Sequence, residues 1–290
     1  MKIHKVYRPD NDATVMTGDC LEKMGSLPKG CCDLVVTSPP YNVGKEYEKT
    51  SSLTEYLDGF VPVVREIRRV LTKNGAVCWQ VGTYVEAGEV TPLDIPFHAI
   101  FKSQGFRLRN RVVWRYAHGL HAKRRFSGRY ETILWMTKSD TYTFNLDSVR
   151  VPAKYPGKKH FKGPKRGQLS GNPLGKNPSD VWDVVRSGWE DGVWDIPNVK
   201  ANHPEKTAHP CQYPIEVAER CVLAMTNAGE TVFDPFAGAG TTAVAALMHG
   251  RKAVCCERSI AYTDIIKDRI NALTKNRLPY RPLGKPVFIP

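Results

Sequence analysis

Residues 37–42 read Thr-Ser-Pro-Pro-Tyr-Asn and combine groups that could hold a flat aromatic amine. They end an apolar run, and neither proline can extend a strand, so we expect a rigid loop at a strand's carboxyl end. The Ser38 hydroxyl and the Pro39 carbonyl could accept both N–H groups of the amine, with Tyr41 stacked on its base. Such an amine is a weak nucleophile, so acceptors would orient its nitrogen and its proton would leave to solvent. Alone, these residues could equally form a structural Pro-Pro turn with a packed tyrosine.

A second segment, 233–242, reads Phe-Asp-Pro-Phe-Ala-Gly-Ala-Gly-Thr-Thr and predicts a strand, a glycine-rich turn and a helix. Gly238 and Gly240 let the backbone bend tightly and approach a ligand, while the helix start offers free N–H groups. After the apolar run 253–256, Glu257 stands where doubly wound folds place an acid against ribose hydroxyls; the alternative is a surface glutamate capping the last helix. The sequence holds no Gly-x-x-x-x-Gly-Lys-Ser/Thr loop, which disfavours a kinase or ATPase.

Together the two segments resemble those of the DNA amino-methyltransferases, which use S-adenosylmethionine. The order along the chain is Ser-Pro-Pro-Tyr, a basic insertion, His-Pro-Cys-Gln-Tyr-Pro at 209–214, and then the glycine-rich segment. This order is similar to that of the β class, and the resemblance weakens only in the insertion and the tail. It implies an α/β fold: a Rossmann-like seven-stranded mixed sheet with helices on both faces, plus an inserted basic target-recognition region.

Carried over by position, the resemblance implies a catalytic segment and a cofactor site. The catalytic residues would be Ser38, Pro39, Pro40 and Tyr41. The S-adenosylmethionine site would contain Asp19, Ser38, His209, Asp234, Phe236, Gly238, Gly240, Thr241, Thr242 and Glu257. Asp19 would pair with the adenine amino group or else be a turn aspartate. Thr241 and Thr242 would approach the methionine carboxylate. His209 would pack beside the methionine end or else be a helix-entry residue.

The target base is the least constrained inference. In the family, Asp or Asn at the first motif position is typical of adenine enzymes and Ser is frequent among cytosine enzymes, so Ser38 favours cytosine. Against that, the segments around Trp114, Glu131 and Trp182 look more like those of small orphan or restriction-associated adenine enzymes. We therefore expect methylation of adenine N6 in duplex DNA by base flipping, with cytosine N4 as the alternative. Cytosine carbon 5 is disfavoured because no Pro-Cys nucleophile follows the catalytic strand.

The chain is strongly basic, with a formal charge of +13 over 290 residues. An excess of this size is typical of polyanion binders, although it can also serve solubility alone. Segment 154–176 carries seven Lys or Arg residues and no acid, so we expect a loop that neutralises phosphates of double-stranded DNA. The candidate DNA contacts are His118, His121, Lys123, Arg124, Arg125, Arg129, Lys158, Lys159, Lys162, Lys165 and Arg166.

Hydrophobic periodicity divides the chain into parts. We expect a catalytic α/β part at 1–137, a target-recognition insertion at 138–200 that could begin as early as about 115, a cofactor-binding part at 201–275 and an extended arm at 276–290. A helix over 60–71 should end at Asn74-Gly75, before a strand at 76–81. Further helices are expected at 97–105, at 215–225, after 240 and after 259, with strands at 111–114, 231–233 and 253–256.

The eight cysteines include no Cys-x-x-Cys pair, and no spaced Cys/His set is present. We therefore expect no metal and a reducing, cytoplasmic environment. No signal peptide or membrane-spanning run is visible, and the resemblance implies a homodimer. The rival functions are methylation of RNA or of a protein by the same fold, and a catalytically silent DNA-binding subunit.

Overall fold

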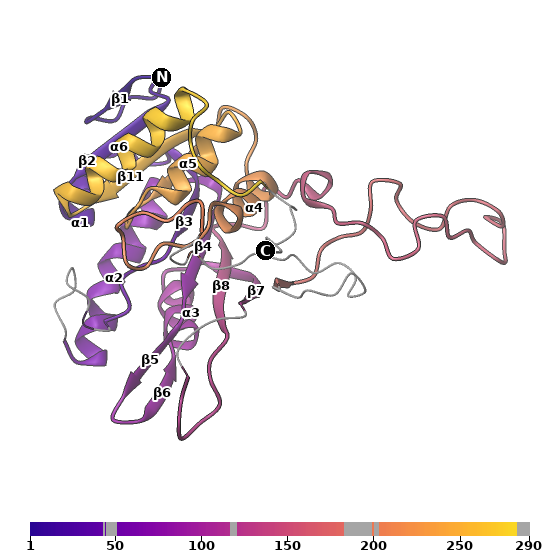
Figure 1. Cartoon of the computed structure of the whole chain (residues 1–290), viewed down its shortest axis with the longest axis horizontal. Coiled ribbons are helices and arrows are strands. Elements are labelled where there is room, and N and C mark those ends of the chain that lie inside the picture. Colours follow the sequence, from indigo (N-terminus) through magenta and orange to yellow (C-terminus); the bar gives the residue numbers. More distant parts are fainter. Residues whose placement is uncertain (43, 45–50, 117–120, 183–198, 200–202, 283–290) are drawn as a thin grey trace.

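The computed structural model describes residues 1–42, 44, 51–116, 121–182, 199 and 203–282. At its centre lies a mixed sheet in which the strands of these residues follow the order β1-β2-β11-β10-β3-β4-β8-β7-β9 (Figure 1). The strands are Ile3–His4 (β1), Ala13–Thr17 (β2), Cys32–Thr37 (β3), Leu71–Val81 (β4), Arg107–Arg115 (β7), Tyr130–Thr137 (β8), Val181–Trp182 (β9), Thr231–Asp234 (β10) and Lys252–Glu257 (β11).

Most of the sheet is parallel. Every neighbouring pair from β1 across to β4 is parallel, whereas β8 runs antiparallel to both β4 and β7. Of the nine described strands in this sheet, the edge strands β1 and β9 have two residues each, which leaves seven longer strands. This arrangement confirms the expected Rossmann-like mixed α/β fold.

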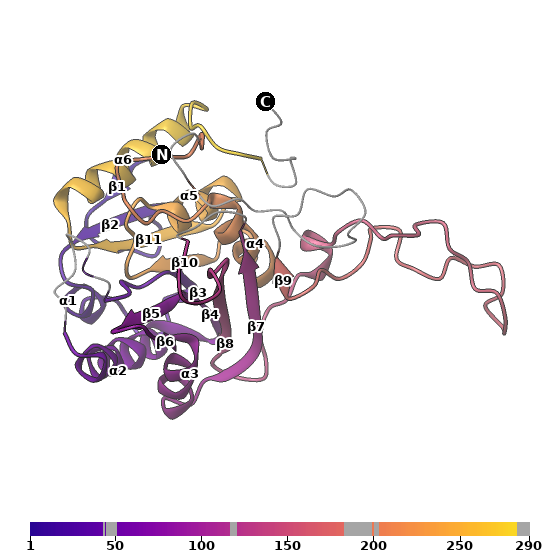
Figure 2. The ribbon, with the colours of Figure 1, turned by 60° about the horizontal axis from the view of Figure 1, so that its bottom comes forward.

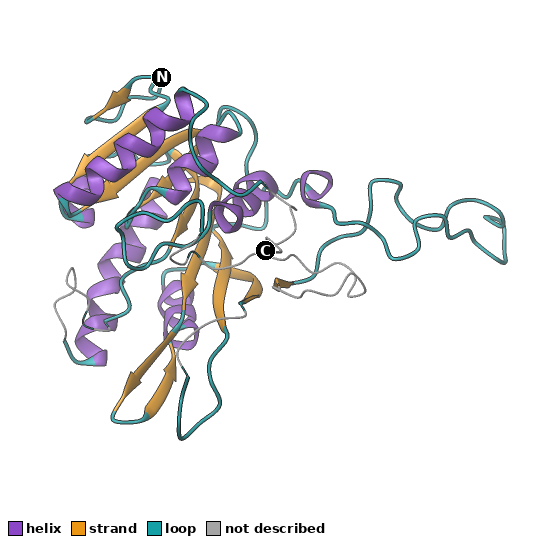
Figure 3. Cartoon of the chain, in the orientation of Figure 1, coloured by secondary structure: helices purple, strands orange, loops and turns teal. Residues whose placement is uncertain are grey.

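Helices cover both faces of the sheet (Figures 2 and 3). One face carries α1 (Cys20–Gly25), α2 (Leu53–Val70) and α3 (Asp94–Ser103), and the other carries α4 (Ile215–Met225), α5 (Thr241–Met248) and α6 (Ile260–Thr274). Strand residues alternate between the two cores: in β3, Leu34 and Val36 enter one core and Val35 enters the other. This alternation is expected for strands that are buried on both faces.

The connection from α2 to β4 differs from the prediction. Asn74-Gly75 does not end the helix, because α2 ends at Val70 and β4 begins at once with Leu71. Leu71 pairs with Cys32, and the register then shifts between Cys32 and Leu34. The glycine turn signal therefore lies within a strand whose pairing partner is distant in the sequence, and a local pattern cannot show that partner.

The other elements that were predicted are confirmed. α4 has the predicted bounds, and α3, α5, α6, β7, β10 and β11 lie where helices and strands were expected. β5 (Thr83–Glu86) and β6 (Glu89–Pro92) form a separate antiparallel hairpin, and Leu146–Val149 is a short 3-10 helix. No helix among the described residues combines the length and the apolar character needed to cross a membrane.

The insertion after β8 projects from the body as a long arm (Figure 1). Two isolated antiparallel bridges, Val151 with Lys176 and Lys159 with Leu169, show that the chain runs outward and then returns alongside itself. Gly175 permits the close pairing at the base, since a Cβ there would lie 2.2 Å from the Val151 carbonyl oxygen. The basic residues of the arm are thus held away from the sheet.

Candidate active site

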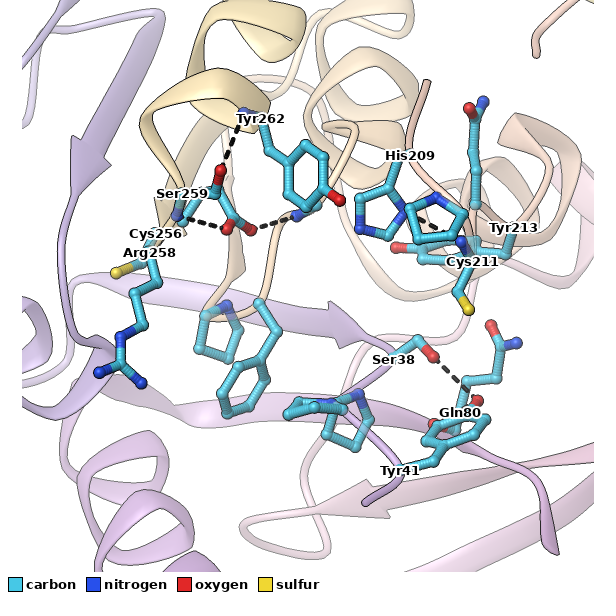
Figure 4. A pocket seen from close by; sticks show the side chains of 18 of the residues that line it. Ser38, Tyr41, Gln80, His209, Cys211, Tyr213, Cys256, Arg258, Ser259 and Tyr262 are labelled. Carbon is cyan, nitrogen blue, oxygen red and sulfur yellow. Dashed lines mark hydrogen bonds between the residues drawn. The ribbon is translucent and has the colours of Figure 1, made fainter. Parts of the chain in front are cut away.

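A cavity of about 940 Å³ lies at the carboxyl ends of the central parallel strands (Figure 4). Segments that directly follow β2, β3, β10 and β11 line it, together with part of the loop before α4. Ligands of open α/β sheets bind at this edge. The predicted site residues in the lining are Asp19, Ser38, Pro39, Pro40, Tyr41, His209, Phe236, Gly238 and Glu257. The fold therefore brings the two sequence motifs to one space.

The glycine-rich turn joins β10 to α5 through left-handed backbone. Gly238 and Gly240 have φ values of +52° and +74°, which favour glycine. A Cβ on Gly238 would lie 2.9 Å from Nε2 of His209, and one on Gly240 would lie 2.9 Å from Cγ2 of Ile266. Of the two glycines, Gly238 presents bare backbone to the cavity, and Gly240 packs against α6 outside the lining that the described residues form.

Asp234, the last residue of β10, lies fully buried beneath this turn. Its Oδ1 accepts hydrogen bonds from Thr37 Oγ1 at 2.6 Å and from the Phe236 N–H at 3.0 Å. Its Oδ2 accepts a bond from the Tyr213 hydroxyl at 3.4 Å. Burial raises the pKa of Asp234 to about 6, and the bond from Thr37 opposes that rise. Asp234 thus ties the end of β3 to the glycine-rich turn from below.

Asp234→Asn should make stability less dependent on pH. The folded pKa of about 6 lies above the ordinary value of 3.8, so the folded state binds this proton more tightly than the unfolded state. The resulting stabilisation is complete below pH 3.8 and is lost as the pH rises through about 6. Between pH 5 and pH 7 the wild type should lose about 1 kcal/mol that the variant keeps. Urea unfolding at both pH values measures this, and equal losses would contradict it.

Thr241 and Thr242 begin α5 and are buried. The Thr241 hydroxyl donates to the Tyr213 carbonyl at 3.1 Å, and the Thr242 hydroxyl donates to the Val36 carbonyl at 2.9 Å. Thr242 also shares a short hydrogen bond with the Tyr213 hydroxyl. Their side chains therefore connect α5 to the body of the fold, and neither residue belongs to the lining formed by the described residues. Their approach to the methionine carboxylate stays a prediction.

Glu257 ends β11 and is partly exposed at the cavity wall. Its Oε2 accepts the Gly238 N–H at 2.7 Å and its Oε1 accepts the Ser259 N–H at 2.8 Å. Burial raises the pKa of Glu257, and these backbone bonds oppose the rise. The N-cap of α6 is Ser259, so Glu257 is not itself the cap. A carboxylate has about four acceptor positions, and ribose hydroxyls could use the remaining ones.

Two other predicted cofactor residues have clear structural roles. Asp19 is the N-cap of α1, and its Oδ1 accepts the Leu21 N–H at 2.9 Å. Phe236 packs edge-on against Phe60 and Trp79, with ring centroids 5.7 and 6.1 Å apart. Both residues also line the cavity, so these structural roles are compatible with cofactor contact.

His209 lies in the loop before α4 and faces the glycine-rich turn. Its Nδ1 accepts the Cys211 N–H at 3.3 Å, and its ring packs against Tyr262 with centroids 4.5 Å apart (Figure 4). α4 begins only at Ile215, after the N-cap Pro214. His209 is therefore not a helix-entry residue, which was the alternative interpretation of its position.

The Ser-Pro-Pro-Tyr segment is held from several sides. Ser38 Oγ and the Tyr41 hydroxyl lie 2.9 Å apart (Figure 4). The Tyr56 hydroxyl donates to the Pro40 carbonyl at 2.8 Å. The ring of Tyr41 lies close to Gly82, where a Cβ would come within 3.3 Å of the ring. These contacts orient the tyrosine hydroxyl toward the interior beside Ser38.

Several residues that were not predicted for the site also line the cavity, and a group of them surrounds Glu131. Gln80, Trp114, Tyr116 and Glu131 line the cavity beside Tyr41. The Gln80 amide donates to Glu131 Oε2 at 2.6 Å, and the Trp114 and Tyr116 rings meet edge-on at 5.3 Å. A glutamine within the apolar strand run 76–81 was the available signal, because a buried polar residue requires partners.

The predicted DNA contacts among the described residues lie outside the cavity lining. His121, Lys123, Arg124 and Arg125 are exposed in the loop between β7 and β8, and Arg129 there is partly exposed. His118 lies outside the described residues. The other five predicted contacts, Lys158, Lys159, Lys162, Lys165 and Arg166, are all exposed in the outer half of the arm. The two sets of described residues therefore lie on separate segments of the fold, as their separation in the sequence indicated.

Comparisons with known proteins agree with this geometry. A family model for N6 and N4 methyltransferases, described as DNA methylase, matches residues 32–268. Type II methyltransferase M.BglII of Bacillus subtilis is 47% identical over 252 residues, covering 87% of this chain and 67% of the relative. Type II methyltransferase M.ScaI of Streptomyces caespitosus is 38% identical, covering 92% and 84%. The DNA adenine methyltransferase YhdJ of Escherichia coli K12 is 32% identical, covering 86% and 79%.

Solved structures also match. A protein of Thermus thermophilus, named as a DNA modification methylase and complexed with S-adenosyl-L-methionine, has a TM-score of 0.61 and 25% identity. The match covers 93% of this chain and 99% of that one. The cytosine-N4-specific PvuII DNA methyltransferase has a TM-score of 0.67 at 19% identity, covering 93% of each chain. The latter likeness concerns the fold alone.

Proposed function

This chain belongs to the N6/N4 family of DNA methylases, and from that premise we propose that it transfers the methyl group of S-adenosylmethionine to the N6 amino group of adenine in duplex DNA. The observation that carries the proposal is the Thr37–Asp234 hydrogen bond of 2.6 Å. It joins the Ser-Pro-Pro-Tyr segment to the glycine-rich turn on the adjacent parallel strands β3 and β10. A base-binding segment and a cofactor-binding turn are thereby held in one fixed relation.

S-adenosylmethionine, the cofactor, supplies a methyl group activated by a positively charged sulfonium. The glycine-rich turn suits a ligand that lies close to the backbone. Gly238 has no room for a Cβ, because one would collide with His209, so bare backbone faces the cavity there. We infer that Glu257 accepts hydrogen bonds from the ribose and that Asp19 lies at the adenine end. Phe236 and His209 would complete the wall between these ends.

The target base would bind against the Ser-Pro-Pro-Tyr segment. Ser38 Oγ and the Pro39 carbonyl would accept the two N–H groups of the amine, which fixes the nitrogen without a covalent bond to the protein. Tyr41 would contact the ring of a base flipped out of the duplex, and Trp114 and Tyr116 line the same part of the cavity. Base flipping supplies the access that a stacked base lacks.

Two observations favour different target bases. The adenine specificity in the name of the Escherichia coli relative supports adenine N6. Ser38 at the first motif position favours cytosine N4 as the second candidate. Methyl transfer from labelled S-adenosylmethionine to unmethylated genomic DNA, followed by digestion to nucleosides and mass analysis, tests both. N6-methyladenine would support the first, N4-methylcytosine the second, and no methylated nucleoside would contradict the proposed function.

We expect the arm to bind DNA phosphates. Replacing Lys158, Lys159, Lys162, Lys165 and Arg166 by alanine should weaken DNA binding at low salt and flatten its salt dependence. Each phosphate that the variant no longer neutralises should reduce the slope of log K against log salt by about 0.9. Binding isotherms over a salt series measure both effects.

The matched control removes the same charge from exposed residues of the body. These are Lys29, Lys73, Lys102, Lys275 and Arg277. Their replacement should leave the slope nearly unchanged if contact with the arm, rather than net charge, governs binding. Equal slopes for the two five-fold variants would overturn the assignment of the arm.

A further inference from the structure

A chain of hydrogen bonds leads from the Ser-Pro-Pro-Tyr segment to Glu131, a half-buried glutamate. Ser38 Oγ lies 2.9 Å from the Tyr41 hydroxyl, which in turn donates to Glu131 Oε2 at 3.1 Å. Glu131 stands near the start of β8, and Gln80 on the paired strand β4 donates to the same oxygen at 2.6 Å. The Tyr116 hydroxyl also bonds the carboxylate. The chain therefore connects three residues that line the cavity.

Glu131 has the properties of a proton acceptor. Burial raises its pKa, and the hydrogen bonds from Gln80, Tyr41 and Tyr116 oppose that rise. The ion pairs found among the described residues do not include Glu131. A partly buried carboxylate that has hydrogen-bond donors, and no paired cation among the described residues, gains a proton more readily than an exposed one.

The ionised glutamate also sets the direction of the chain. A carboxylate can only accept hydrogen bonds, so the Tyr41 hydroxyl must donate to it. The oxygen of Tyr41 is then available to accept the Ser38 hydroxyl proton. With that proton turned toward Tyr41, Ser38 Oγ presents lone pairs to the cavity, which is the arrangement that an incoming amine N–H requires.

We propose that Ser38, Tyr41 and Glu131 form a proton relay that takes up the proton released by the methylated amino group. The inference rests on the proposed function and replaces release of this proton directly to solvent. In it Ser38 touches the substrate, whereas Glu131 acts through Tyr41 and is a positioning and proton-accepting residue.

The charges and atoms of this step balance. The amino nitrogen forms a bond to the methyl carbon while the bond from that carbon to sulfur breaks, leaving a neutral thioether. The nitrogen loses one proton to Ser38 Oγ, the Ser38 hydroxyl proton moves to the Tyr41 oxygen, and the Tyr41 proton moves to Glu131 Oε2. The positive charge of the sulfonium is thus cancelled by the negative charge of the carboxylate, and Glu131 later returns its proton to water in the cavity.

Single-turnover methyl transfer as a function of pH tests the relay. The wild-type rate should fall as the pH drops through the pKa of Glu131, because the protonated acid cannot accept the proton. Glu131→Gln should lower the rate by about 10²-fold or more and remove this low-pH fall. Tyr41→Phe should lose a similar factor, and the double variant should lose no more than either single variant.

Two further measurements separate a relay from a structural role. Infrared difference spectra of the protein without cofactor or DNA should show a protonated carboxyl band that titrates above the pH of an ordinary glutamate and is missing in Glu131→Gln. Binding of S-adenosylmethionine and thermal unfolding should change little in the variant. The matched controls are Glu219→Gln, at a buried glutamate paired with His249, and Tyr142→Phe, and both should keep the wild-type rate and pH profile.

The outcomes distinguish the two proposals. If the wild type methylates DNA and Glu131→Gln keeps its rate and low-pH fall, the relay is wrong and the proposed function stands. Losses that multiply in the double variant would likewise overturn the relay, because they would mean that Tyr41 and Glu131 act independently. If the wild type transfers no methyl group to nucleic acid, the proposed function fails and the relay fails with it.

Discussion

Tyr41→Ala is expected to reduce single-turnover methyl transfer by roughly 500- to 10,000-fold while S-adenosylmethionine binds normally. The variant loses the ring that contacts the flipped base, and base–aromatic stacking contributes about 1–3 kcal/mol. It also loses the hydroxyl that bonds Ser38 and Glu131, and loss of the proton relay adds about 2.7 kcal/mol, or about 10²-fold. At about 1.4 kcal/mol for each factor of ten, these losses give the stated range. Rapid-quench kinetics and calorimetry measure the two quantities.

Tyr41→Phe separates the two contributions, because it keeps the ring and removes only the hydroxyl. Tyr142→Ala is the control for loss of a partly buried tyrosine: Tyr142 packs against Trp135 with ring centroids 5.5 Å apart, and it is not part of the cavity lining formed by the described residues. A Tyr41→Ala rate within about three-fold of wild type would contradict the placement of the target base.

The second large effect is expected at the cofactor. Asp234→Ala should weaken S-adenosylmethionine binding by about 100-fold or more. The substitution leaves the Thr37 hydroxyl and the Phe236 N–H without their buried acceptor, and each such loss costs about 1–3 kcal/mol. The turn would then lose the support that fixes it relative to β3. Isothermal titration with the cofactor measures the dissociation constant directly.

Two further variants serve as controls for Asp234→Ala. Asp234→Asn retains an oxygen that can accept both bonds, so its cofactor affinity should stay within about ten-fold of wild type. Asp94→Ala removes another buried carboxylate, one that pairs with Arg111 on the side of α3, and should not affect cofactor binding. Normal affinity in Asp234→Ala would show that the 233–242 segment is not the cofactor turn.

Local signals in the sequence predicted much of this molecule. The prolines after β3 and the left-handed glycines after β10 impose backbone geometry by themselves, so both turns were identified correctly. The apolar periodicity of α4 was sufficient for its bounds. The prediction that the helix ends at 74–75 was wrong for the opposite reason. Leu71 is a strand residue only through its pairing with distant Cys32.

Side-chain partners were harder to predict. Glu131 reads as the polar start of an apolar strand, and its role depends on Gln80 and Tyr41, which arrive from β4 and from the loop after β3. Likewise, Asp234 belongs to the predicted cofactor motif, yet its side chain points beneath the turn to Thr37. The spacing of residues within a sequence motif identifies such residues. Only the three-dimensional arrangement shows which way their side chains face.

The strand order has a consequence for how the chain is made. β2 and β3 are successive in the sequence among the strands of the central sheet, yet β11 and β10, the last described strands along the sequence, lie between them. Until β10 and β11 have been synthesised, the nascent chain therefore has one unpaired strand edge on β2 and another on β3. Unpaired edges of this kind invite association with other chains. Productive folding thus waits for Glu257 to be synthesised and to leave the ribosome, and the enzyme should depend on chaperones more than its size suggests.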